Sequence, residues 1–263
     1  MILTVLGSGT IVPGPDRVAA GYLVERPDRH GWLLDCGPGT WHRLGQLGRL
    51  PSDIGHVVIT HFHPDHFADL VPLCFSLKNP RFDVAGPPLT IWGPRGIERI
   101  VSDLRQAYGR SIVPRHREIL VRELEPGRVT IDGIELTARS VEHTAASHAY
   151  RLEDEAGSSL VYSGDVAECD AIVEIARGCD VFVLECSFPD GAGTPNHLTP
   201  SQAGRIAAAA DPSLLVLTHF YPECEGADLL GPCRQSFSGP IVLAEDRVRI
   251  DVASAAVQVE GGV

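Results

Sequence analysis

The sequence lacks the features that would place the chain in a membrane or in a disulfide-rich scaffold. No apolar run approaches the roughly 18 residues that a membrane-spanning helix needs. The opening segment, "MILTVLGSGT", has neither the charged region nor the long apolar region of a signal peptide. The cysteines number seven, an odd count, and include no CxxC pair, which argues against a disulfide framework or a zinc ribbon. We therefore expect reduced thiols, a cytoplasmic location and no association with membranes.

Positive charge is also scarce, because 22 Lys and Arg face 34 Asp and Glu, which gives a net charge of -12. An overall basic surface for nucleic acid is thereby excluded. A small local patch stays open, with an ordinary solvated surface as the alternative. The arginines that could form such a patch are Arg95, Arg110, Arg115 and Arg117.

Glycine-rich loops that cradle phosphates are absent as well. The segments "GSGT" and "DCGPGT" each follow an apolar run, but neither continues as GxGxxG or GxxxxGK[ST]. We interpret both as tight turns after strands.

Short apolar runs alternate with helical patterns along the 263 residues, of which 44% are hydrophobic. Strands are predicted at 2–6, 20–26, 31–35, 56–60, 88–92, 118–123, 129–131, 134–141, 148–153, 159–163, 180–185, 214–218, 240–244 and 247–252. Helices are predicted at 39–48, 65–78, 94–109, 168–177, 199–210 and 226–236. No Ser/Gly linker or charge block interrupts the pattern. The sequence therefore predicts one α/β domain over 1–263, with mixed sheets inside and helices outside.

A cluster of metal-ligand side chains stands in "VVITHFHPDHFADLVPL", residues 57–73. An apolar run ends in His61, His63, Asp65 and His66. If the strand continues to Pro64, His61 and His63 share one side of it, and the other two begin the next helix. Imidazoles and a carboxylate at such a junction suit zinc. The alternative is a polar turn capped by Asp65, which accounts poorly for four such residues in six positions.

Three more apolar runs end in a similar side chain: His143, Asp165 and His219. Each has an ordinary explanation by itself, Asp165 as a helix N-cap and the two histidines as loop residues. Their repetition after strands indicates a site, because α/β proteins collect functional residues at the ends of strands.

The segment "THFHPDH" matches the HxHxDH motif of the metallo-β-lactamase superfamily, and His143, Asp165 and His219 follow in that superfamily's order. "LLDCGPG" at 33–39 resembles its early strand and turn, so the resemblance spans nearly the whole chain. It implies a four-layer αβ/βα sandwich with a two-metal site at one edge. By this resemblance, one metal would be held by His61, His63 and His143, the second by Asp65, His66 and His219, and both by Asp165.

The resemblance also implies the chemistry of the site. It points to two divalent ions, zinc first, with manganese or iron as alternatives. The reaction would be hydrolysis by a hydroxide that bridges the metals, and Asp65 would orient that hydroxide as a catalytic residue.

Within the superfamily, the sequence resembles ribonuclease Z in four segments: "VLTHFYP", "SVEHTAASHAYRL", "PNHLTPSQAGRIAAAA" and "IWGPRGIERI". This resemblance gives His197 the role of proton donor, or of hydrogen-bond donor to the phosphate; capping of the following helix is the alternative. The family's His-Glu-Ala-Thr-Phe segment reads "LECSF" here, so Leu184 replaces the histidine and Glu185 remains.

The chain departs from ribonuclease Z between His143 and Asp165. Only residues 144–164 separate them, which leaves no room for the arm that grips tRNA. We therefore expect a small-molecule or short nucleic-acid phosphodiester as substrate rather than tRNA. Hydrolysis of carboxylic esters, lactones or thioesters, or an arylsulfatase activity, is the alternative. Dimers are usual in the resembled family, so a homodimer is an open expectation.

Three further residues carry two interpretations each. Asp35 either orients a metal-ligating histidine or stabilises a turn. Cys224 lies near the metals or is a small buried thiol. His148 faces the pocket or the sheet, on the same face as Tyr150.

Overall fold

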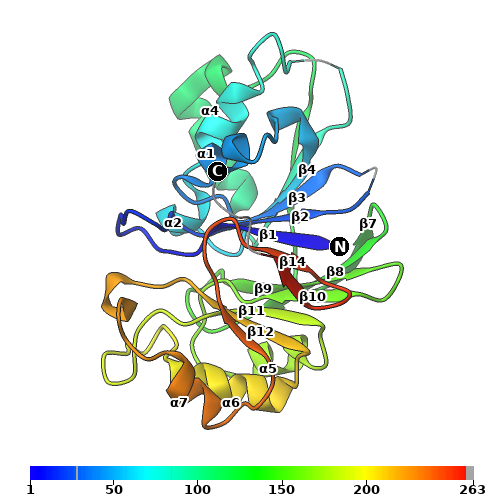
Figure 1. Ribbon diagram of the computed structural model, residues 1–263. Helices are drawn as coiled ribbons and strands as arrows, with labels where there is room; N and C mark the ends of the chain where they lie inside the picture. Colours follow the sequence, from blue (N-terminus) through cyan, green and yellow to red (C-terminus); the bar gives the residue numbers. More distant parts are fainter. Residues whose placement is uncertain (28, 84, 259–263) are drawn as a thin grey trace.

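The computed structural model describes residues 1–27, 29–83 and 85–258. Two mixed sheets lie face to face between two outer groups of helices (Figure 1). The first sheet has the order β15-β14-β1-β2-β3-β4-β5-β6 and the second the order β13-β12-β11-β10-β9-β8-β7. Counting helices, sheet, sheet and helices, this is the predicted four-layer αβ/βα sandwich.

The strands match the predicted runs to within a few residues. The first sheet consists of β1 (Ile2–Gly7), β2 (Gly21–Glu25), β3 (Gly31–Leu34), β4 (Ile54–Val58), β5 (Leu89–Gly93), β6 (Ile119–Glu123), β14 (Arg249–Asp251) and β15 (Ala256–Gln258). The second consists of β7 (Gly127–Ile131), β8 (Ile134–Ser140), β9 (His148–Asp154), β10 (Ser159–Tyr162), β11 (Val181–Glu185), β12 (Leu214–Thr218) and β13 (Ile241–Leu243). The short, exposed edge strand β15 was not predicted.

The helices are α1 (Thr40–Gln46), α2 (Pro64–Phe67), α3 (Leu70–Ser76), α4 (Ile97–Tyr108), α5 (Asp170–Ala176), α6 (Pro200–Ala210) and α7 (Leu230–Arg234). Short 3-10 turns lie at Pro51–Asp53, Gly109–Ile112 and Pro222–Cys224. The chain contains no helix, within the described ranges, that is long and apolar enough to cross a bilayer.

Helix α6 begins where the sequence predicts. Thr199 and Gln202 form a reciprocal capping box, in which the Thr199 N–H donates to Gln202 Oε1 at 2.9 Å. Pro200 occupies the first turn, where its missing N–H costs no helical hydrogen bond.

The single helix predicted over 65–78 is wrong, because the structure divides it into α2 and α3. Pro72 has no N–H to donate to the carbonyl of Ala68, and its ring would clash with that carbonyl. The chain therefore breaks at Ala68 and Asp69 and restarts just before the proline. Asp69 uses the break, since its carboxylate accepts the N–H groups of Gly39 and Trp41, both at 2.9 Å.

Strands β1, β2, β3 and β4 of the first sheet are buried on both faces. Along β2, Tyr22 and Val24 pack into the cluster between the sheets, whereas Leu23 packs under the helices of the first sheet. Covered sheets of this kind give near-continuous apolar runs.

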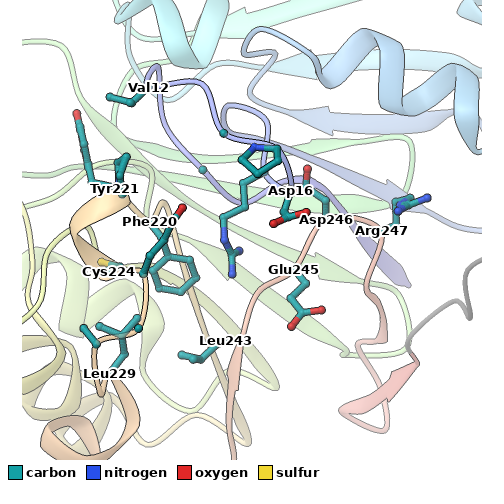
Figure 2. Close-up of a pocket in the computed structure, with 18 residues that line it drawn as sticks. Val12, Asp16, Phe220, Tyr221, Cys224, Leu229, Leu243, Glu245, Asp246 and Arg247 are labelled. Atoms are coloured by element: carbon teal, nitrogen blue, oxygen red, sulfur yellow. The ribbon is translucent and has the colours of Figure 1, made fainter.

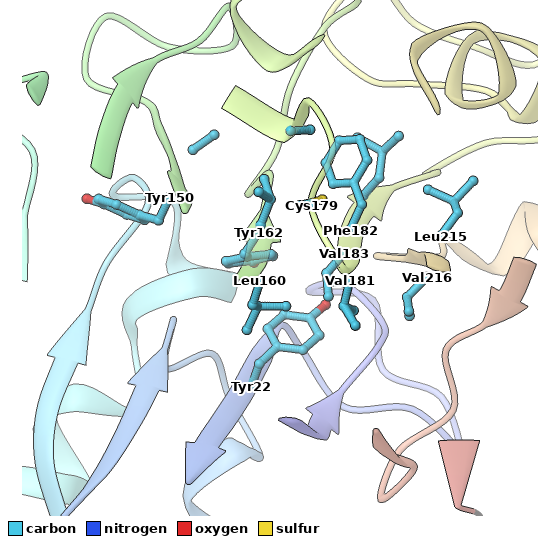
Figure 3. Packing of buried hydrophobic residues seen from close by; sticks show 14 of the residues in the cluster. Tyr22, Tyr150, Leu160, Tyr162, Cys179, Val181, Phe182, Val183, Leu215 and Val216 are labelled. Carbon is cyan, nitrogen blue, oxygen red and sulfur yellow. The ribbon is translucent and has the colours of Figure 1, made fainter. Parts of the chain in front are cut away.

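Three buried tyrosines connect the core to one edge of the sheets (Figure 3). The Tyr22 hydroxyl is 2.6 Å from Thr218 Oγ1, and the Tyr150 hydroxyl donates to the carbonyl of Ile59 at 2.8 Å. The Tyr162 hydroxyl donates to Asp35 Oδ2 at 2.7 Å. Burial raises the pKa of each of the three phenols, so they remain donors. Tyr22 thus contacts the residue before His219, and Tyr150 holds the backbone two residues before His61. Tyr162 holds the carboxylate that also contacts His66.

Candidate metal centre

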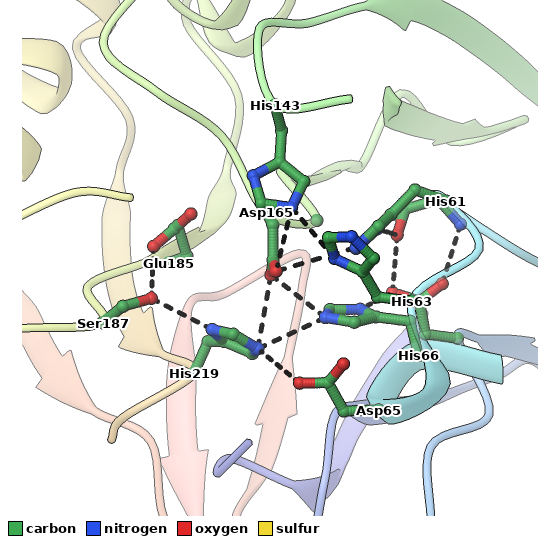
Figure 4. Close-up of polar contacts among 12 residues, drawn as sticks. His61, His63, Asp65, His66, His143, Asp165, Glu185, Ser187 and His219 are labelled. Carbon is green, nitrogen blue, oxygen red and sulfur yellow. Dashed lines mark hydrogen bonds and ion pairs between the residues drawn. The ribbon is translucent and has the colours of Figure 1, made fainter. Parts of the chain in front are cut away.

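The predicted ligands leave the carboxyl ends of strands at one edge of the sandwich (Figure 4). β4 leads to His61, β8 to His143, β10 to Asp165 and β12 to His219. The strand does not continue to Pro64, since β4 ends at Val58 and residues 59–63 form a loop. Loop curvature, not strand alternation, therefore brings His61 and His63 together.

Asp165 lies between two sets of side chains, and each of its oxygens faces one set. Oδ2 is 3.7 Å from His61 Nε2 and 3.5 Å from His143 Nε2. Oδ1 is 3.1 Å from His66 Nε2 and 3.3 Å from His219 Nε2. The carboxylate is 3% exposed, so water cannot compensate its charge. Five of the seven predicted ligands thus converge on one small volume.

The remaining two predicted ligands complete the two sets. His63 Nδ1 is 3.2 Å from His143 Nε2, on the Oδ2 side of Asp165. Asp65 Oδ2 is 3.6 Å from His219 Nε2, on the Oδ1 side. Donor atoms of His61, His63, His143 and Asp165 lie within 4.8 Å of one another, as do those of Asp65, His66 and His219.

The donor atoms fit divalent ions better than they fit a hydrogen-bond network. Within the described residues, His61 Nε2 and Asp165 Oδ1 are buried and make no hydrogen bond. Burial lowers the pKa of His61 to about 2, so this imidazole is a neutral ligand with a lone pair. Buried nitrogen and oxygen atoms without a hydrogen-bond partner destabilise a fold unless another group, such as a metal ion, binds their lone pairs. The imidazole and carboxylate atoms form two separate groups, and ligands of these types suit one zinc-like ion in each group.

Asp35 performs both roles that its sequence position suggests. Its Oδ2 is 2.7 Å from His66 Nδ1, which leaves His66 Nε2 directed at Asp165. Its Oδ1 accepts the Thr60 N–H at 2.7 Å, and Oδ2 also accepts the Thr60 hydroxyl at 2.8 Å. A carboxylate that orients a ligand histidine in this way is typical of metal sites.

Asp65 is held by the loop after β1. Its Oδ2 accepts the N–H of Ile11 at 3.2 Å. Burial by itself would raise the pKa of Asp65, but the hydrogen bond to His219 and the proximity of His66 outweigh burial and lower it. The side chain is therefore a carboxylate that can ligate or accept a hydrogen bond.

Glu185 and His197 form a pair beside the metal-ligand cluster. His197 Nδ1 is 3.1 Å from Glu185 Oε1, and the Glu185 carboxylate is fully buried at the end of β11. Burial would lower the pKa of His197, but the hydrogen bond and charge of Glu185 raise it. Glu185 also accepts the N–H groups of Val166, at 2.7 Å, and Leu198, at 3.2 Å. It therefore joins the loop of Asp165 to the loop of His197.

Ser187 is a site residue that sequence reasoning missed. Its hydroxyl donates to Glu185 Oε2 and lies 3.0 Å from His219 Nδ1. Its position two residues beyond the end of β11 was the available signal, but a serine after a strand is too common to single out.

The other residues considered lie apart from the ligand cluster. Cys224 is a buried thiol whose Sγ lies 3.3 Å from the Ser187 carbonyl. His148 is buried on the same face of β9 as Tyr150, with ring centroids 6.1 Å apart. Arg117 does not belong to the arginine patch considered from the sequence. It is 5% exposed, and its guanidinium donates to the carbonyls of Pro51 and Ile54.

Comparison with known proteins agrees with this geometry. A family model described as "Beta-lactamase superfamily domain" matches residues 30–220. An uncharacterized protein of Mycobacterium leprae is 36% identical over 244 residues, covering 91% of this chain and 84% of its own. A ribonuclease Z of Mycobacterium bovis is 27% identical over 281 residues, which cover 95% of this chain and 98% of the relative.

A solved structure has the same fold. The metallo-beta-lactamase fold protein YhfI from Bacillus subtilis superimposes with a TM-score of 0.79 at 24% identity, covering 94% of this chain and 98% of that one. Fold, family match and a His/Asp cluster suited to divalent ions together identify the chain as a member of the metallo-β-lactamase superfamily of metal-dependent hydrolases, resembling ribonuclease Z.

Proposed function

We propose that the protein is a binuclear metal-dependent phosphodiesterase. The observation that carries the proposal is the position of Asp165, whose two oxygens face two separate sets of ligand atoms. One ion would be held by His61, His63 and His143, and the other by Asp65, His66 and His219. Zinc suits these donors best, with manganese or iron as alternatives. When bound, two such ions neutralise charge on the phosphate oxygens and make water more acidic at the site.

Asp65 would orient the attacking water. Its lowered pKa keeps it ionised, so it accepts a hydrogen bond from the water rather than donating one. The N–H of Ile11, in the loop after β1, donates to Asp65 Oδ2 and limits rotation of the carboxylate. Positioning of this kind contributes to catalysis by holding the nucleophile close to the reacting atom.

His197 would protonate or stabilise the leaving oxygen. Glu185 accepts at Nδ1, so the imidazole presents Nε2 to the substrate, and the raised pKa makes a proton available there. The ring lies 5.0 Å from that of His143 and 5.8 Å from that of His219, measured between centroids. Because a donor atom of His197 also lies within 4.8 Å of Asp165 and His219, ligation of a metal is the competing role.

The substrate we propose is a small molecule or a short nucleic acid with a phosphodiester, not tRNA. The similarity to ribonuclease Z supports a phosphodiester. Residues between His143 and Asp165 form only β9, β10 and their turns, with no protruding arm. The net charge of -12 also disfavours a large polyanion, whose phosphates need Lys and Arg contacts.

Hydrolysis of bis(p-nitrophenyl) phosphate by zinc- or manganese-loaded protein tests the proposal. Asp65→Ala should lower turnover by about two orders of magnitude or more while circular dichroism shows an unchanged fold. Activity in both proteins alike would point to a contaminant. A metal-replete sample without activity would overturn the phosphodiesterase proposal and move the search to lactones, thioesters and aryl sulfates.

A further inference from the structure

A cavity of about 690 Å³ opens beside the ligand cluster, between residues 9–17, 220–229 and 243–247 (Figure 2). Its volume lies within the range of roughly 300–1,000 Å³ that is usual for small-ligand pockets. None of the roles assigned so far uses this space.

The cavity adjoins the metal-ligand cluster at Tyr221, which lines the cavity together with Val12. The Tyr221 ring is 5.9 Å from the ring of His219 and 6.0 Å from that of His197. Ile11, which precedes the lining residue Val12, donates its N–H to Asp65 Oδ2. A molecule that extends from the cluster past Tyr221 therefore enters this space.

The lining of the cavity combines apolar side chains with charged residues that are already engaged. Phe220, Leu229 and Leu243 contribute apolar surface. The Arg17 guanidinium lies 4.8 Å from the centre of the Phe220 ring and donates to Ser8 Oγ and the Ala244 carbonyl. Asp246 accepts from the backbone of Ser8 and of Val18 and pairs with Arg43 at 3.1 Å. Arg17 and Asp246 therefore connect the segments that form the wall of the cavity and are not available to bind a ligand.

The rim of the cavity is acidic. Asp16, Glu225 and Glu245 are exposed, and the described part of the chain offers none of them an ion pair; the exposed cation among the lining residues is Arg247. Carboxylates attract hydroxyl and amine donors. They repel a second phosphate, which carries the same sign of charge.

We propose that this cavity binds the organic group of a substrate with a single phosphodiester, and that this group is uncharged, presents an apolar face and carries hydroxyl or amine donors at its edge, as a nucleoside does. The inference rests on the proposed function, which places the phosphodiester at the metal-ligand cluster. It adds that specificity comes from the acidic, apolar-lined cavity, and that substrates with further phosphates are excluded there.

Two esters with the same leaving group and the same charge provide the kinetic test: thymidine 5′-(p-nitrophenyl phosphate) and methyl p-nitrophenyl phosphate. We expect kcat/KM to be at least about tenfold higher for the thymidine ester, since only its nucleoside reaches the cavity. Leu243→Trp, which fills the cavity, should bring the ratio of the two values close to one. Val113→Trp, an equally bulky change at an exposed position outside the cavity, should keep the wild-type ratio.

Binding of free thymidine, followed by saturation-transfer NMR, separates this inference from the proposed function. Thymidine that binds the wild type but not Leu243→Trp supports the cavity even if neither ester is cleaved, in which case the phosphodiesterase proposal alone fails. Equal cleavage of both esters without thymidine binding would overturn the cavity and leave the phosphodiesterase proposal standing.

An exposed variant keeps the test decisive if Leu243→Trp does not fold. Glu245→Lys reverses one rim charge at the surface. It should raise kcat/KM for thymidine 5′-(p-nitrophenyl phosphate) bearing a 3′-phosphate, relative to the unphosphorylated ester, by roughly three- to tenfold. An unchanged ratio would contradict the role of the acidic rim.

Discussion

The hydroxyl of Ser187 lies 3.0 Å from His219 Nδ1 and also donates to the buried carboxylate of Glu185. Because Glu185 binds His197 as well, one carboxylate supports both a predicted metal ligand and the predicted proton donor. His66 is oriented by Asp35 directly, whereas His219 is oriented by Glu185 through a hydroxyl.

Removal of that hydroxyl should loosen the metal at the His219 side. We expect Ser187→Ala to weaken binding of one of two zinc ions by roughly ten- to a hundredfold, the usual effect of losing a group that orients a ligand histidine. Competition with a chromogenic chelator measures this. Ser187→Thr keeps the hydroxyl and should bind zinc nearly as the wild type does; equal affinity of all three proteins would contradict the link.

Replacement of His197 should have an effect that depends on the leaving group. With an alkyl phosphodiester, His197→Ala should lower kcat by about a hundredfold or more, because the alkoxide needs a proton. With p-nitrophenolate as leaving group the loss should be small. Rates measured for a series of esters give the slope of log kcat against the pKa of the leaving group. This slope should be steeper in His197→Ala than in the wild type. A parallel loss for every ester, together with loss of bound metal, would instead make His197 a ligand.

Loss of Asp35 should destabilise the fold as well as the metal centre. Asp35→Ala strands four buried donors: the N–H and the hydroxyl of Thr60, the Nδ1 of His66 and the hydroxyl of Tyr162. Loss of a buried carboxylate that pairs several buried donors should lower the free energy of unfolding by about 3–5 kcal/mol. Tyr162→Phe removes one donor and should cost only about 1 kcal/mol. Urea denaturation of the metal-free proteins compares the two, and similar losses would mean that Asp35 is not the centre of this network.

His56 gives the fold a pH dependence distant from the metal centre. Burial lowers the pKa of His56, even though Asp132 lies 2.9 Å from its Nε2. The unfolded chain therefore takes up a proton first as the pH falls through about 6.5. The stability that His56 contributes is present above that pH and is lost as the pH drops toward its lower folded pKa. Urea denaturation should show a smaller loss of stability between pH 8 and pH 5 in His56→Gln than in the wild type.

Most strands, and the convergence of the seven candidate metal ligands at one edge, could be predicted from the sequence because their signals are local. An apolar run followed by His61, His143, Asp165 or His219 marks a strand and its end, and the cap and proline of α6 lie within four residues of each other. Pro72 is an equally local signal for the division between α2 and α3.

Only the tertiary structure decided which side chains share a partner. Asp35 and Tyr162, 127 residues apart, meet because the two sheets pack face to face. Ser187 meets His219 because β11 and β12 are parallel neighbours whose carboxyl ends lie at the same edge. The cavity beside the metal centre is likewise assembled from three distant segments. Local sequence sets the type of each residue and the end of each strand, but strand order and sheet packing set the distances, and no short pattern encodes them.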